Sequence, residues 1–235
     1  MRLPYLLSKT YIPKNTPESE TAGIKIQKDR CTILFGGNAS GDYKLKPFLI
    51  HKAKNPRCFT KNKIVTSQLP VHYRFNKTAW MSKLLFKDWF ENCFIPNVKN
   101  YCKRKNIAYK ILLVLDNATG HGKELANVDE NVKIVFLPPN TTSLIQPMDQ
   151  GLIATFKVGF KHLLMTQAIK VVDGRTTNLI QFLKKITILD AIKLIDKAWQ
   201  NVPKSAAKEF GTNFYSARNL TNQMILTKMP KLIKL

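Results

Sequence analysis

The chain has 235 residues, of which 44% are apolar and 23% charged. This apolar content is enough for a hydrophobic core and excludes a wholly disordered chain. The sequence contains no run of about 18 apolar residues, so no membrane span is expected. Lysine and arginine number 38 against 15 aspartates and glutamates, a formal charge of +23. An excess of this size favours a polyanionic partner, most simply nucleic acid, over a merely soluble basic protein.

The positive charge is concentrated in one interval. Between Asp42 and Asp88 the sequence contains no acidic residue. Aromatic residues are interleaved there, and we interpret most of them as core residues, although some could stack on bases. The side chains predicted to contact nucleic acid phosphates are Lys44, Lys46, Lys52, Lys54, Arg57, Lys61 and Lys63.

The first predicted element is a β-hairpin. Residues 1–30 contain three prolines and are interpreted as a partial segment and loop. The β-branched and apolar residues 31–35 predict a strand that ends in a turn at Gly36-Gly37-Asn38. Gly41-Asp42 is a second turn signal, and residues 45–51 predict the return strand. Residues 51–71 then form a basic connector with two prolines.

A helix is predicted to begin near Ala79, capped by Asn76 or Thr78. Helical spacing then predicts a kink or restart at Pro96. The apolar face of this helix is predicted to contain Trp80, Leu84, Leu85, Trp89, Phe90 and Phe94.

Two strands covered on both faces are predicted next. Residues 111–115 and 132–137 are almost continuously apolar, which is typical of a parallel or mixed α/β sheet. A strand, a crossover and a second strand favour a right-handed connection. Helices are predicted after Pro147, with Phe156 and Phe160 on the apolar face, and again over residues 188–199. Residues 228–235 are expected to be a loose basic tail.

Two aspartates provide the candidate chemistry. Asp116 ends the first of these strands, where α/β folds place ligands, and Asp149 lies in the first turn of a helix. Their oxygens suit Mg²⁺ or Mn²⁺, and Asn117, His121 and Gln146 could support the same site. The alternatives are a strand-ending turn for Asp116 and a favourable helix-dipole contact for Asp149. For His121 the alternative, which we favour, is an ordinary surface or hydrogen-bonded histidine.

Several motifs carry a family resemblance. LDNA at 115–118 with Gly120-His121, LPPNTTS at 137–143 and QPMDQG at 146–151 resemble the DDE superfamily of pogo, Tigger and jerky-type transposases, within the mariner superfamily. The resemblance covers residues 3–199. It implies a ribonuclease H-like core over residues 31–170, a mixed sheet flanked by helices, followed by a helical segment and basic tail at 171–235. It also implies nuclear location, DNA as partner, and three carboxylates that hold Mg²⁺ or Mn²⁺.

One part of the family pattern is not found. The family's first carboxylate follows a first strand in an Asp-Glu-Thr-Gly-like motif, and neither occurs before residue 31. The four acids Glu18, Glu20, Asp29 and Asp42 do not end an apolar strand. We therefore expect a catalytically impaired, DNA-binding endonuclease-like domain. The alternatives are an active enzyme with a longer N-terminus and a host-recruited, non-catalytic chromatin module; a homo-oligomer stays open.

The four cysteines form no C-x-x-C pair, which predicts reduced thiols in the nucleus or cytosol.

Overall fold

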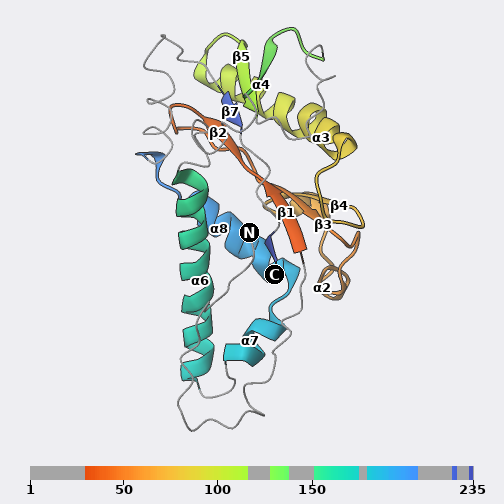
Figure 1. Cartoon of the computed structure of the whole chain (residues 1–235), viewed down its shortest axis with the longest axis vertical. Helices are drawn as coiled ribbons and strands as arrows, with labels where there is room; N and C mark the ends of the chain where they lie inside the picture. Colours follow the sequence, from red (N-terminus) through yellow and green to blue (C-terminus); the bar gives the residue numbers. More distant parts are fainter. Residues whose placement is uncertain are drawn as a thin grey trace.

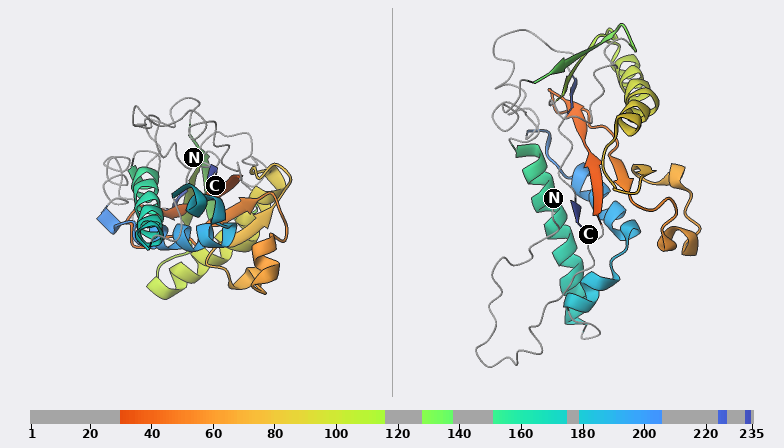
Figure 2. Two further views of the ribbon diagram at one scale, coloured as in Figure 1. Left: turned by 90° about the horizontal axis from the view of Figure 1, so that it is seen from below. Right: turned by 45° about the vertical axis from the view of Figure 1, so that its right-hand side comes forward.

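The computed structural model of the chain describes residues 30–115, 128–137, 151–174, 179–205, 224–226 and 233–234. It has the predicted mixed α/β architecture (Figures 1 and 2). The strands are β1 (Arg30–Leu34), β2 (Gly36–Asn38), β3 (Phe48–His51), β4 (His72–Phe75), β5 (Ile111–Leu115), β6 (Val132–Phe136), β7 (Met224–Leu226) and β8 (Ile233–Lys234). The helices are α2 (Arg57–Lys61), α3 (Lys83–Trp89), α4 (Ile95–Lys105), α6 (Ile153–Asp173), α7 (Leu179–Lys185) and α8 (Ile188–Gln200), with a 3-10 turn η1 (Thr66–Gln68) and a π-helical segment η2 (Phe90–Phe94).

The predicted hairpin is confirmed and organises both sheets. β1 pairs antiparallel with β3, from Cys31 opposite His51 to Leu34 opposite Phe48. The hydrogen-bonded strand orders are β4-β3-β1-β8 and β2-β7-β5-β6, and only Phe35 separates β1 from β2. The prediction of a turn at residues 36–38 was wrong, because these residues form β2. The second predicted turn signal, Gly41-Asp42, is confirmed: the chain turns around Gly41, whose φ of 71° suits glycine.

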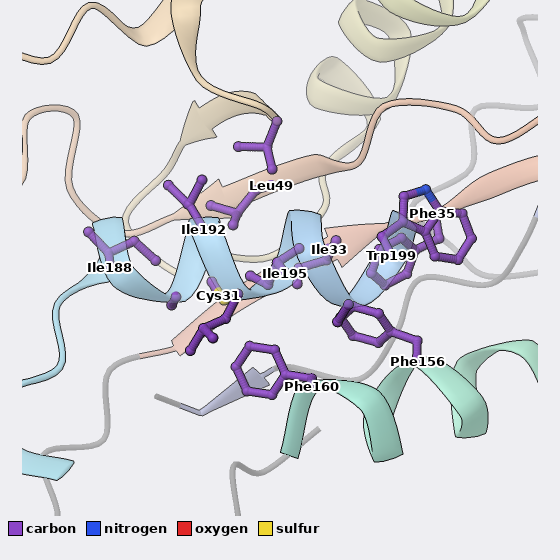
Figure 3. Close-up of a cluster of buried hydrophobic side chains, with 14 of the residues drawn as sticks. Cys31, Ile33, Phe35, Leu49, Phe156, Phe160, Ile188, Ile192, Ile195 and Trp199 are labelled. Atoms are coloured by element: carbon purple, nitrogen blue, oxygen red, sulfur yellow. The ribbon is translucent and has the colours of Figure 1, made fainter. Parts of the chain in front are cut away.

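Alternate side chains of the hairpin enter two different hydrophobic cores. Cys31, Ile33 and Leu49 point into what we call the α6–α8 core, where they meet Phe156, Phe160 and Ile192 (Figure 3). Leu34, Phe48 and Ile50 point the opposite way into the α3–α4 core, which also contains Phe86, Trp89, Phe90, Phe94, Leu113 and Leu115. This is the two-residue periodicity of a strand covered on both faces.

The two long helices of the α6–α8 core follow the predicted patterns. α6 buries Phe156, Phe160 and Leu164 at helical spacing. α8 begins at a capping box, in which the Thr187 hydroxyl accepts a hydrogen bond from the Asp190 amide and the Asp190 carboxylate accepts one from the Thr187 amide. No helix in the described ranges is long and apolar enough to cross a membrane.

The helix predicted from Ala79 begins later than expected. Ser82 is the N-cap, and its Oγ accepts a hydrogen bond from the Leu85 amide. Ala79 has a left-handed φ of 55°, which is incompatible with the interior of a helix. The predicted burial of Trp80 and Leu84 was therefore wrong: their exposed fractions are 59% and 81%. At the kink or restart predicted at Pro96, η2 passes into α4, and the backbone of Phe94 and Ile95 stays helical through this junction.

Residues 51–71, predicted as a connector, contain two short elements. α2 and η1 occur there, and β4 follows directly, pairing parallel with β3. Phe59 of α2 and Tyr73 of β4 stack edge to face at 5.0 Å between ring centroids. α2 and η1 are too short to produce a periodic pattern of apolar residues in the sequence.

The predicted parallel pair is β5 and β6, with Ile111 opposite Val132 and Leu115 opposite Phe136. β5 is buried almost throughout, as predicted. β6 is not, because it lies at the edge of the described sheet and exposes Lys133 and Val135. β7 connects this pair to the hairpin, running antiparallel to β2 and parallel to β5.

The expectation of a loose tail was wrong at Ile233 and Lys234. These two residues form β8, which pairs antiparallel with β1. The C-terminal segment therefore contributes a strand to each of the two sheets. Cys31, Cys93 and Cys102 are buried and Cys58 is half-buried.

Candidate functional site

The carboxyl end of β5 is the candidate metal centre. β5 ends at Leu115, directly before Asp116. The Leu137 amide, just past β6, donates a hydrogen bond of 2.8 Å to the Leu115 carbonyl. The two parallel strands therefore end at the same edge of the sheet, which is where ligand-binding residues of α/β proteins usually lie. Leu113, Val114 and Leu115 are buried, so the strand that leads to this edge is held in place by packing.

α6 is the element that follows Asp149. It begins at Ile153, four residues after that aspartate. Phe156 packs against Phe35, between β1 and β2, with 4.5 Å between the ring centroids. The N-terminal end of α6 points toward the half of the molecule that contains β2 and β7 (Figure 1). The start of α6 is therefore anchored to the hairpin that connects the two sheets.

The predicted metal site itself falls outside the described residues. Asp116, Asn117, His121, Gln146 and Asp149 all lie there, so their roles stay predictions. Within the described ranges, no group of three histidines, cysteines or acids is placed to hold a metal ion. The chemistry of the predicted donors fits the expected cation, since two carboxylates are the oxygen ligands that Mg²⁺ and Mn²⁺ prefer.

Five of the seven predicted phosphate-binding residues form an exposed basic segment. Lys52, Lys54, Arg57, Lys61 and Lys63 are all exposed. Arg57 and Lys61 are the first and last residues of α2. α2 and its flanking loops project from the sheet in the right-hand view of Figure 2. These cations are accessible to a large anion.

Lys44 and Lys46 have different environments. The Lys44 Nζ donates hydrogen bonds of 2.8, 2.8 and 3.0 Å to the carbonyls of Trp199, Gln200 and Val202. It thereby caps the C-terminus of α8, where a cation is favoured, and burial lowers its pKa. Lys46 is half-buried beside His72, whose pKa is lowered to about 4 by burial and by the charges of Lys46 and Arg74.

Asp42 has a structural role at the hairpin turn. Its carboxylate accepts hydrogen bonds from Ser40 at 2.7 Å and Tyr101 at 3.1 Å, and Lys105 Nζ lies 2.9 Å away. Burial acts to raise the pKa of Asp42, but hydrogen bonds from Asn38, Lys105, Ser40 and Tyr101 hold it well below its usual range. The contacts with Tyr101 and Lys105 tie the turn to α4.

Sequence reasoning missed Trp80 as a surface residue. It assigned Trp80 to a buried helical face, whereas the side chain is 59% exposed. The signal that could have identified it is Ser82, a good N-cap residue that moves the helix start beyond Trp80.

Comparison with known proteins identifies a family match over most of the chain. The sequence model described as DDE superfamily endonuclease matches residues 28–210. The human Jerky protein homolog is 38% identical over 152 residues, which is 63% of this chain and 27% of that protein. The mouse Jerky protein is 32% identical over 195 residues, or 82% of this chain and 32% of that protein. Human Tigger transposable element-derived protein 7 is 35% identical over 158 residues, or 61% of this chain and 28% of that protein.

The aligned parts span about a third or less of each of these relatives. No solved structure matches the chain.

Proposed function

Because the chain belongs to the DDE superfamily endonuclease family of transposase-derived domains, we propose that it is a nuclear DNA-binding domain with a ribonuclease H-like fold. The single observation that carries the proposal of DNA binding is the exposed basic segment around α2. It contains five exposed cations in twelve residues, within an interval free of acids from residue 43 to residue 87. Such a segment neutralises backbone phosphates and releases their counterions, which favours binding without regard to sequence.

The proposal for the metal centre rests on Asp116 and Asp149. Both would hold Mg²⁺ or Mn²⁺ at the carboxyl end of β5, with Asn117, His121 and Gln146 near them. Divalent metal use is general in the DDE superfamily. When bound, such ions activate a water or a 3′-hydroxyl and stabilise the leaving oxygen of a phosphodiester. The sequence holds two of the three carboxylates expected in the family, and we therefore propose that catalysis by these 235 residues is impaired.

The DNA-binding proposal is tested by the salt dependence of duplex affinity. Five phosphate contacts predict a slope of log K against log salt of roughly −4.5. We expect the triple variant Arg57→Ala, Lys61→Ala, Lys63→Ala to lower affinity and to make this slope shallower by about 3. The measurement is fluorescence anisotropy with a labelled duplex from about 50 to 200 mM salt.

A matched control removes the same charge elsewhere. Lys184, Lys193 and Lys197 are exposed on α7 and α8, and Asp190 and Asp196 lie on the same helix as two of them. Their triple alanine variant should change the slope much less. Equal effects of the two triple variants would mean that net charge, and not the α2 segment, governs binding.

The catalytic proposal is tested by nicking of supercoiled DNA with Mg²⁺ or Mn²⁺. We expect no nicking by the 235-residue polypeptide. Nicking that disappears with Asp116→Asn would contradict this and support an active enzyme. A polypeptide extended by in-frame upstream sequence tests the longer N-terminus. For the chromatin-module alternative, association with chromatin should survive Asp116→Asn and Asp149→Asn together.

A further inference from the structure

Trp80 differs from the other two tryptophans of the chain in being exposed. Trp89 and Trp199 are 2% and 1% exposed, against 59% for Trp80. Its immediate neighbours Ala79 and Met81 are buried, at 1% and 8%. The side chain is therefore directed to solvent from a backbone that is held on both sides. A large exposed aromatic side chain in such a setting commonly marks an interaction site.

The turn that presents Trp80 is held by hydrogen bonds. The Asn76 Oδ1 accepts a hydrogen bond of 3.1 Å from the Trp80 amide, and the Asn76 Nδ2 donates one to the Trp80 carbonyl. The Ala79 amide donates to the Asn76 carbonyl at 3.1 Å, and Ala79 itself adopts a left-handed φ of 55°. Because these bonds hold the backbone on which Trp80 is carried, a ligand that stacks on the ring does not have to order the turn first.

The surroundings of Trp80 combine exposed apolar side chains with positive charge. Phe75 is 45% exposed, and the Lys54 Nζ lies 5.9 Å from the centre of its ring. Lys77 is exposed between Phe75 and Trp80 in the sequence. The nearest acids in the sequence, Asp88 and Glu91, already face Arg74 at 2.6 Å and Lys87 at 3.8 Å. The segment that connects β4 to α3 (Figure 1) therefore carries Lys77 and Trp80, with Lys54 against Phe75 at its start, and these lysines favour an anion.

We propose that Trp80 is a stacking platform for an unpaired base of a nucleic acid strand, with Lys54 and Lys77 contacting the adjacent phosphates. This rests on the proposed DNA binding and deepens it. Aromatic rings beside a basic groove are how proteins hold single strands without regard to sequence. In an intact duplex the base faces are covered by neighbouring bases, so a ring at this position selects a melted or single-stranded segment. A protein partner would instead need an acidic face to match these lysines.

Tryptophan fluorescence provides a direct test. Because Trp89 and Trp199 are buried, quenching of the intrinsic fluorescence by added oligothymidine should report mainly on Trp80. We expect Trp80→Ala to remove most of this quenching and to weaken oligothymidine affinity on the order of tenfold, with Trp80→Phe retaining much of it. Leu84→Ala is the matched control, since it removes an even more exposed apolar side chain that cannot stack; we expect less than about twofold change.

Binding to a blunt-ended duplex of the same length distinguishes the stacking proposal from the proposal of general DNA binding. We expect Trp80→Ala to leave duplex affinity unchanged. If the unaltered chain binds the duplex but Trp80→Ala has no effect on oligothymidine affinity, the stacking platform is wrong and DNA binding stands. If neither DNA is bound, both proposals fail. If Trp80→Ala dissolves a homo-oligomer in analytical ultracentrifugation without changing oligothymidine affinity, Trp80 is a protein contact and the proposal is overturned.

Discussion

The two cores on either face of the hairpin are assembled in different ways. The α3–α4 core is formed largely by residues 81–115, which follow the hairpin closely, and aromatic packing dominates it, with Trp89 and Phe94 stacked at 5.3 Å between ring centroids. The α6–α8 core brings residues 152–202 back to the same strands, and polar contacts anchor it. The Trp199 Nε1 donates a hydrogen bond of 2.9 Å to the Leu45 carbonyl, and Lys44 caps the end of α8.

The two cores therefore depend on different interactions: hydrophobic packing in the α3–α4 core, and packing together with directional hydrogen bonds in the α6–α8 core. Local segments can pack by hydrophobicity alone, because few alternative partners are within reach. A helix that returns from more than a hundred residues away gains a defined position from directional hydrogen bonds. Consecutive residues, Lys44 and Leu45, supply both contacts with the end of α8.

The largest expected effect comes from removing the aromatic anchor of the α6–α8 core. Trp199→Ala should lower the free energy of unfolding by about 3–5 kcal/mol, because it leaves a cavity beside Phe35 and Phe156 and an unpaired carbonyl at Leu45. Phe86 is fully buried in the α3–α4 core, and Phe86→Ala should lower the free energy of unfolding by no more than Trp199→Ala does. Urea denaturation measures both. Trp199→Phe removes the hydrogen bond with a smaller loss of packing, and a stability equal to that of the unaltered chain would show that the hydrogen bond does not anchor α8.

A smaller effect is expected from Lys44→Met. This change keeps much of the side chain's length and removes the three bonds to the end of α8, so it should cost about 1–2 kcal/mol after allowance for partial exposure. Lys193→Met, at an exposed position of α8, should stay within about 0.5 kcal/mol of the unaltered chain. Thermal denaturation compares the two variants. Equal melting temperatures of the two variants would show that Lys44 does not stabilise the α6–α8 core.

A pH dependence of stability is expected on the α3–α4 side. Burial and the charges of Lys46 and Arg74 lower the pKa of His72 from 6.5 to about 4. The unfolded chain therefore binds a proton at His72 before the folded chain does, and stability should fall as pH drops from about 6.5 toward 4. His72→Gln should flatten this part of the pH profile in urea denaturation. An unchanged slope would assign the dependence to other groups.

The elements that could be predicted from sequence are those with long or strongly biased patterns. β1, β5, α6 and α8 have continuous apolar runs or helical spacing, so local pattern and burial agree. The short elements could not be found: β7 and β8 have three and two residues and form only because partner strands are present. Trp80 was misassigned because one residue's backbone conformation, the left-handed Ala79, shifted the start of the helix.

The motifs around Asp116 and Asp149 identify the family without any knowledge of contacts, because they consist of residue types at fixed spacing. The overall positive charge and the α/β class also follow from the sequence by itself. Which cations can reach a partner follows from the folded structure: Lys44 binds the end of α8, while Lys54 and Arg57 are exposed. The physical reason is that charge belongs to a residue, whereas accessibility depends on neighbours brought from distant parts of the chain.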